Sequence, residues 1–151
     1  MTTYKNGNAV DALIDGEVDF LLHVANCQGK MGSGIALEIK KRIPSAYLNY
    51  KNHEKINGKV ILGRVSSGSN VVNLHAQEYY GYDSKRYLDY EALAKCLEKT
   101  KGCLDKVGTD VKIGVPFKMG CDRAGGSWNI VVSMLEHYLQ DYKVVVYDIN
   151  K

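Results

Sequence analysis

The chain has 151 residues, of which 45% are hydrophobic and 25% charged, and a formal net charge of +3. This length fits one compact domain, residues 1–151, and excludes the very small proteins that need disulfides or metals to hold a core. The charge is too small to indicate a nucleic-acid partner by itself, although it favours a small polyanion over a cation as the ligand.

Cysteine usage and apolar patterning favour a soluble intracellular protein. None of the four cysteines has zinc-ligand spacing, and free thiols are typical of a reducing compartment. The longest apolar stretch, residues 20–25, is far too short to span a membrane, and the chain does not open on a signal-peptide pattern. We therefore expect a cytoplasmic monomer without metal, cofactor or membrane partner.

The first half of the chain alternates apolar runs with helical patterns. Residues 18–25 form a short apolar run that ends in a polar, glycine-containing loop, as a buried strand does. Residues 33–43 carry an isoleucine at every fourth position, which predicts an amphipathic helix that Pro44 ends. The basic residues 40–42 in its last turn complement the helix dipole, and an anion site is the alternative interpretation.

The rest of the chain continues the alternation of strands and helices. Strands are predicted at residues 59–65, 69–74, 111–116 and 143–149, and helices at 45–56, 89–104 and 127–138. The last helix is expected to bury a face that includes Ile130, Val131 and Leu135. This order indicates an α/β domain whose largely parallel sheet is sandwiched between helices, with ligands beyond the carboxyl ends of the strands.

Two glycine-rich loops fall at that edge of the sheet. The first, residues 26–36, has Gly29, Gly32 and Gly34, which uncover backbone N–H groups ahead of a helix N-terminus that favours an anion. The second, residues 119–128, repeats the order of strand, glycines and capped helix. Neither has P-loop or dinucleotide-binding spacing. Together the loops can hold a diphosphate from both sides, and tight turns without a ligand are the alternative.

At these loops the sequence resembles the macrodomain family, over nearly its whole length. The resemblance is carried by residues 7–11 (Gly-Asn-Ala-Val-Asp), by 23–36 and by 116–128. It is strongest to the branch of ADP-ribose 1''-phosphate phosphatases and terminal ADP-ribose glycohydrolases. It implies a macrodomain-like three-layer α/β/α sandwich with a mixed, largely parallel central sheet, and ADP-ribose or a derivative as the ligand.

The resemblance also implies binding residues. Adenine would lie near Asn8 and Val10, and the distal ribose near Asn26. The phosphates would lie between Gly32, Ser33, Gly34, Ile35 and Ala36 on one side and Met119, Gly120, Cys121, Arg123 and Ala124 on the other.

Two departures from this branch bear on catalysis. Its glycohydrolases use a lysine where this chain has Gln77, whose amide cannot form a Schiff base; Lys30 or Lys85 as a substitute is an alternative. Many members carry an acid immediately before the tryptophan of the second loop, where this chain has Ser127. Asp122 is either a relocated carboxylate or a hydrogen-bonding partner within its own loop.

Phosphomonoester hydrolysis needs a group that orients the attacking water and an acid for the leaving oxygen. His23 resembles a histidine of the phosphatase-type members and can supply acid–base chemistry near neutral pH; a buried histidine bonded to a backbone carbonyl is the alternative. We take His23 and Asp122 as the candidate catalytic residues. Arg123 is a candidate for bidentate binding of the terminal phosphate, with a surface arginine as the alternative.

Three functions remain open. The first is a hydrolase that removes the phosphate from ADP-ribose 1''-phosphate, which His23 and Asp122 favour. The second is a glycohydrolase that acts on ADP-ribosylated protein or nucleic acid, against which Gln77 weighs. The third is a non-catalytic binder of ADP-ribose-like nucleotides, which Ser127 keeps open. The expected partner is a small nucleotide, with an ADP-ribosylated macromolecule as a further candidate.

Overall fold

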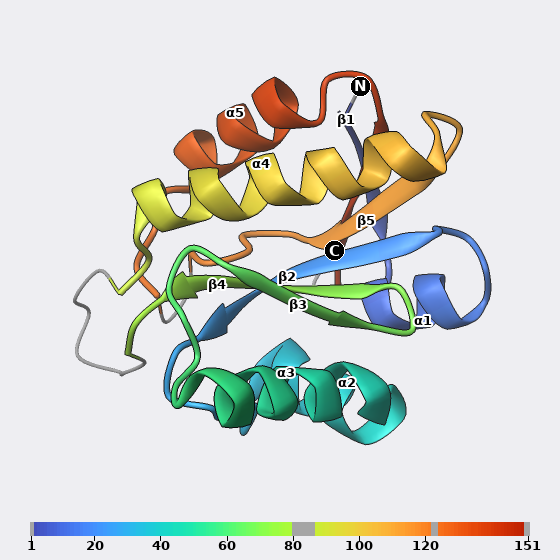
Figure 1. Cartoon of the computed structure of the whole chain (residues 1–151). Coiled ribbons are helices and arrows are strands. Elements are labelled where there is room, and N and C mark those ends of the chain that lie inside the picture. Colours follow the sequence, from blue (N-terminus) through green and yellow to red (C-terminus); the bar gives the residue numbers. More distant parts are fainter. Residues whose placement is uncertain (1, 80–86, 122–123, 150–151) are drawn as a thin grey trace.

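The computed structural model describes residues 2–79, 87–121 and 124–149 as a six-stranded sheet covered by helices on both faces (Figure 1). The strands are β1 (Thr2–Asn6), β2 (Phe20–Asn26), β3 (Val65–Gly68), β4 (Val71–Gln77), β5 (Lys112–Pro116) and β6 (Lys143–Asp148). The helices are α1 (Ala9–Ile14), α2 (Gly34–Arg42), α3 (Pro44–Asn57), α4 (Tyr90–Val107) and α5 (Trp128–Tyr138).

The sheet has the strand order β1-β6-β5-β2-β4-β3, and only the β3–β4 pair within it is antiparallel. Helices α1, α2 and α3 cover one face, and α4 and α5 cover the other (Figure 1). The predicted three-layer α/β/α sandwich with a mixed, largely parallel sheet is therefore confirmed. Parallel neighbours end at the same edge, so the loops that follow β2 and β5 meet there.

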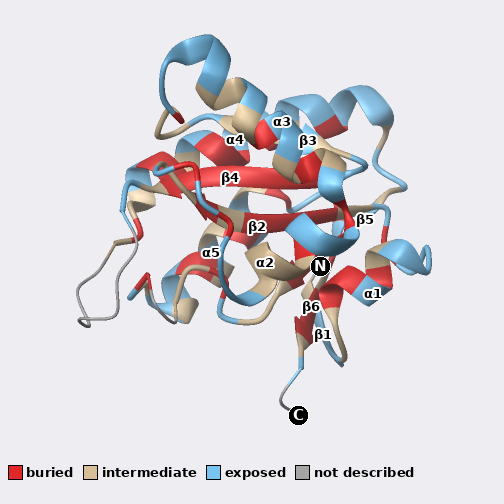
Figure 2. Cartoon of the chain, turned by 90° about the horizontal axis from the view of Figure 1, so that it is seen from below, coloured by how far each residue is buried: buried red, intermediate tan, exposed pale blue. Residues whose placement is uncertain are grey.

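Each face of the sheet has its own hydrophobic cluster, and buried residues run along the central strands (Figure 2). Leu22 packs in the cluster beneath α4 and α5, whereas its neighbour Leu21 packs beneath α1, α2 and α3, as alternation along a strand requires. Three buried polar side chains, His23, Asn73 and His75, interrupt the apolar pattern of β2 and β4.

The β3–β4 hairpin differs from the prediction. Strands were predicted at 59–65 and 69–74, but β3 begins only at Val65 and the chain turns at Ser69 and Asn70. Both turn residues have positive φ, at 48° and 66°, as a two-residue hairpin turn requires. The sequence lacks a glycine at these two positions, so the turn could not be recognised from it.

Two further differences concern exposed positions. Ile130, predicted on the buried face of the last helix, is 45% exposed, and Val131 and Leu135 form the buried stripe of α5. Strand β1 was not predicted, because most of its residues are exposed and it has no apolar run. Within the described ranges, no helix is both long enough and apolar enough to cross a membrane.

The second glycine-rich loop closes on itself at Gly126, whose N–H donates to the Gly120 carbonyl at 2.9 Å. A Cβ at Gly126 would collide with the Leu88 side chain and would lie 2.7 Å from that carbonyl oxygen. We expect Gly126→Ala to lower the free energy of unfolding by ~1–3 kcal/mol, the usual effect of overpacking, in a urea titration.

Gly102→Ala in α4 is the matched control, since a Cβ there meets no atom within 4 Å. It removes a helix glycine without a clash and should raise stability by ~0.4–1 kcal/mol. Equal effects of the two substitutions would contradict the steric explanation.

Candidate functional site

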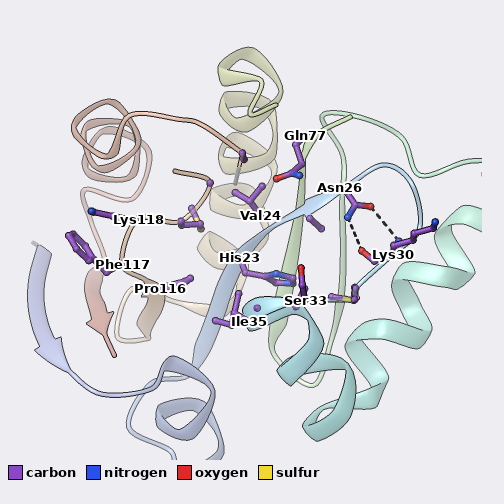
Figure 3. A pocket seen from close by; sticks show the side chains of 18 residues that line it. His23, Val24, Asn26, Lys30, Ser33, Ile35, Gln77, Pro116, Phe117 and Lys118 are labelled. Carbon is purple, nitrogen blue, oxygen red and sulfur yellow. Dashed lines mark hydrogen bonds between the residues drawn. The ribbon is translucent and has the colours of Figure 1, made fainter. Parts of the chain in front are cut away.

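A cleft of about 530 Å³ opens at the carboxyl ends of β2 and β5, between the two glycine-rich loops (Figure 3). Residues 23–26 of β2 and Gln77 of β4 line it from the sheet. Residues 30–36 line it from the first loop, and residues 116–120 and Ala124 from the second. Its volume lies within the range of nucleotide-sized ligand sites.

The N-terminus of α2 opens into this cleft. Residues 33–36 lead from the loop into the helix, and Gly34 takes a φ of 57° at the junction. In the described part of the chain, the Ser33 side chain makes no capping hydrogen bond, so the N–H groups of the first turn remain for a ligand. Together with the helix dipole they favour a negatively charged group.

Two lysines add positive charge to the cleft. Lys30 comes from the first loop and Lys118 from the second, and Figure 3 shows them at opposite sides of the site. Lys118 has a φ of 59° and lies within a turn in which the Met119 N–H donates to the Pro116 carbonyl at 3.1 Å. The described lining residues include no carboxylate. The cleft therefore offers N–H donors and flanking cations, which suit a diphosphate.

Asn26 lines the cleft, but its side chain organises its own loop. Its Oδ1 accepts from the Gln28 N–H at 3.0 Å and lies 3.0 Å from the Tyr50 hydroxyl. Its Nδ2 donates to the Lys30 carbonyl at 2.8 Å (Figure 3). Both polar atoms of the Asn26 side chain therefore have partners within the protein. Its contact with a distal ribose stays a prediction.

The residues predicted near adenine do not line the cleft. Asn8 caps α1, since its Oδ1 accepts from the Val10 N–H at 2.8 Å, and its Nδ2 donates to the Glu38 carboxylate at 3.1 Å. The Val10 side chain is fully buried in the core. Asn8 therefore ties α1 to α2, and Val10 packs beneath them. Neither residue lines the cleft, so the structure does not support their role in adenine binding, which stays a prediction.

Most residues predicted along the phosphates do line the cleft. They are Gly32, Ser33, Gly34, Ile35, Ala36, Met119, Gly120 and Ala124. Cys121 is half-buried beside the cleft, and its thiol donates to the Met119 carbonyl at 3.4 Å. Asp122 and Arg123 lie outside the described residues, as does Lys85. Binding by any of these residues stays a prediction.

His23 belongs to a buried chain of hydrogen bonds beneath α3. Its Nε2 lies 2.6 Å from Asn73 Oδ1, Asn73 Nδ2 donates to the Ser66 hydroxyl at 3.0 Å, and that hydroxyl lies 2.8 Å from His75 Nε2. His75 Nδ1 lies 3.2 Å from the Ile61 carbonyl, which can only accept. Each proton is thereby assigned: His75 carries its proton on Nδ1 and His23 carries its proton on Nε2.

Burial lowers the pKa of His23 and of His75 to about 4, so both rings are neutral at pH 7. The neutral ring favours the alternative interpretation of His23 as a buried, hydrogen-bonded histidine, although its partner is the Asn73 side chain rather than a backbone carbonyl. A neutral, buried ring does not support the predicted acid–base role of His23, which stays a prediction.

Burial also raises the pKa of Cys27 to about 11, so its thiol is not a ready nucleophile.

Several cleft residues were not among the predicted binding residues. Phe117 and Lys118 directly follow β5, and their position after a parallel strand was the signal that could have found them. Phe117 packs edge-on against Trp128, with ring centroids 5.3 Å apart. Gln77, named for its chemistry, lies in the cleft at the end of β4, where its Nε2 donates to the Tyr79 carbonyl at 3.0 Å.

Two curated proteins are similar in sequence to part of this chain. No family model matches the sequence. DNA ADP-ribosyl glycohydrolases of Mycobacterium tuberculosis and Mycobacterium bovis are 30% identical over 97 residues, which cover 59% of this chain. The match spans only 26% of the length of these relatives.

Solved structures are similar over nearly the whole chain. A Bacteroides thetaiotaomicron protein of unknown function has a TM-score of 0.80 and 24% identity, with 98% of each chain covered. The macrodomain of Mycobacterium tuberculosis DarG has a TM-score of 0.76 and 23% identity, with 97% of each covered. Thermosipho africanus DarTG in complex with ADP-ribose has a TM-score of 0.76 and 18% identity, over 99% of this chain and 42% of that one. This chain has the macrodomain fold, and the resemblance seen in its sequence is confirmed.

The buried histidines predict a loss of stability in acid. Both folded-state pKa values, about 4, lie below the ordinary value of 6.5, so between these pH values the unfolded chain binds more protons than the folded one. The free energy of unfolding should therefore be highest above pH 6.5 and fall towards pH 4, by ~3 kcal/mol for each histidine. Urea titrations across this range measure the fall.

His75→Gln should flatten this dependence, because it removes one titrating ring from the network. His137→Gln, at an exposed position on α5, is the control and should keep the full fall. Wild-type stability that stays constant from pH 7 to pH 4 would contradict the assignment.

Proposed function

We propose that the cleft binds ADP-ribose or an ADP-ribosyl group. One observation carries this proposal: the uncapped N-terminus of α2 opens between Lys30 and Lys118 in a cleft of nucleotide size. N–H donors with cations on either side are the partners that a diphosphate needs. The ADP-ribose complex of the similar Thermosipho africanus protein supports the same ligand.

The two ends of the cleft differ in character, which gives the ligand a direction. Asn26, Lys30 and Gln77 lie towards one end, and Pro116 and Phe117 towards the other (Figure 3). We place the distal ribose at the polar end and the adenine at the apolar end, because hydroxyl groups need hydrogen-bonding partners and a base needs a flat apolar surface.

Gly32 offers a test of the phosphate position. A Cβ at Gly32 meets no atom within 4 Å, so a side chain there projects into open space at the edge of the cleft. We expect Gly32→Glu to weaken ADP-ribose binding at least tenfold more than Gly32→Gln, since the two side chains have the same shape and differ in charge. Calorimetric titration measures both, and equal affinities would argue against a phosphate at this place.

We further propose that the protein is a hydrolase that releases ADP-ribose from a modified macromolecule, with DNA as the first candidate. The curated relatives that match this chain are named DNA ADP-ribosyl glycohydrolases, which supports this reaction. In such a reaction the oxygen of water bonds to C1'' of the distal ribose, while the leaving group departs with the bonding electrons and takes up a proton. Gln77 lies in the cleft and has no amine, so it excludes a lysine adduct at this position.

Phosphate removal from ADP-ribose 1''-phosphate stays a candidate from the sequence, and so does binding without catalysis. The phosphatase prediction relied on His23 and Asp122. His23 is neutral and fully buried, which weakens the prediction, and Asp122 lies outside the described residues.

An assay with two substrates separates these reactions. We expect the protein to release ADP-ribose from an ADP-ribosylated DNA oligonucleotide, with no adduct trapped by borohydride, because Gln77 cannot form an imine. A trapped adduct would instead support Lys30, which lines the cleft, as the substitute lysine. Chromatography follows ADP-ribose, and a colorimetric assay follows phosphate from ADP-ribose 1''-phosphate. Phosphate release with the DNA left intact would establish the phosphatase instead. Binding without either product would leave a reader of ADP-ribose.

A further inference from the structure

The first glycine-rich loop is held from outside the cleft by α3. Tyr50 of α3 is fully buried, and its hydroxyl donates to the Asn26 carbonyl at 2.5 Å. The same hydroxyl lies 3.0 Å from Asn26 Oδ1, which in turn accepts from the Gln28 N–H at 3.0 Å and from the Lys30 N–H at 3.4 Å. Tyr50 thus contacts Asn26 at the beginning of the segment 26–30 and, through the Asn26 side chain, supports its end.

A second contact comes from Lys51, the next residue of α3. Lys51 Nζ donates to the Gly29 carbonyl at 3.2 Å and pairs with Glu54 at 2.5 Å. Gly29 is buried with a φ of 74°, and a Cβ there would collide with the Glu54 carboxylate. Tyr50, Lys51 and Glu54 therefore pack against the outer side of the loop, and none of the three lines the cleft.

We propose that Tyr50, supported by Lys51 and Glu54, is a positioning residue for the ligand site. It fixes the segment 26–30 in the conformation in which Asn26 and Lys30 line the cleft. This inference rests on the proposed binding of ADP-ribose. A loop that is ordered before binding loses less conformational entropy when the ligand arrives, and a loop that populates other conformations lowers the apparent affinity by the fraction that is competent.

The chain offers a matched control for Tyr50. Tyr142 is also almost fully buried, and its hydroxyl lies 2.5 Å from Asp105 Oδ1, in the hydrophobic cluster on the other face of the sheet. Tyr50→Phe and Tyr142→Phe each remove one buried hydroxyl. A residue that only stabilises the core would affect the melting temperature in both variants and ligand affinity in neither.

We expect Tyr50→Phe to weaken binding of ADP-ribose about tenfold, and Tyr142→Phe to leave the affinity unchanged. Hydrogen exchange should speed up at the Gln28 and Lys30 amides, which donate to Asn26 Oδ1, in Tyr50→Phe only. Wild-type affinity in a folded Tyr50→Phe variant would overturn the proposal. If Tyr50→Phe does not fold, Lys51→Met should weaken binding, whereas Lys55→Met at an exposed position of α3 should not; equal affinities would overturn the proposal as well.

Wild-type protein that does not bind ADP-ribose would overturn the proposed function rather than the loop contact. Hydrogen exchange then still tests whether the Tyr50 hydroxyl holds the loop. Unchanged protection of the Gln28 and Lys30 amides in Tyr50→Phe would show that the hydroxyl does not hold the loop, and lost protection would show that it does.

Discussion

The adjacency of β2 and β5 is the constraint on which the site depends. These strands lie far apart in the sequence, yet Phe20 pairs with Ile113 and Leu21 with Gly114 in parallel register. Gly114 also leaves room for the segment that leads into β2, because a Cβ there would lie 3.0 Å from the Val18 side chain. Parallel neighbours end at one edge, and each of these strands runs into a glycine-rich loop and then a helix. The cleft between the loops follows from topology before any side chain is considered.

The sheet also explains why two histidines, the side chains best suited to acid–base chemistry, have a structural role. His23, Asn73 and His75 face α3 from β2 and β4, where water does not reach them. Buried polar groups are tolerated when hydrogen-bonded, and the chain of contacts through Ser66 assigns each proton. Among the described residues, His23 Nδ1 remains buried without a partner. The neutral His23 ring, buried and fixed in this way, resists protonation. This favours a structural role for His23 over the acid–base role predicted from the sequence.

Features set by local pattern could be predicted from the sequence, and features set by distant partners could not. The strand predicted at 18–25 and the helix at 33–43 match β2 and α2 closely, because their apolar periods are regular. Both loops were found from their glycines. The hydrogen bonds of Asn26 and His23 were not, since Tyr50 and Asn73 lie 24 and 50 residues away along the chain.

The two walls of the cleft are built by different means. The first loop is held by side chains of α3, whereas the second is closed by backbone contacts: the Gly126 N–H donates to the Gly120 carbonyl, and the Ala124 carbonyl accepts from the N–H groups of Tyr87 and Leu88. Backbone contacts change little when a side chain is replaced, unless a glycine gains a Cβ. The first wall is therefore the one that substitutions outside the cleft can adjust. In a macrodomain fold built like this, substitutions on α3 can change the shape of the first loop, while backbone hydrogen bonds keep the second loop in place.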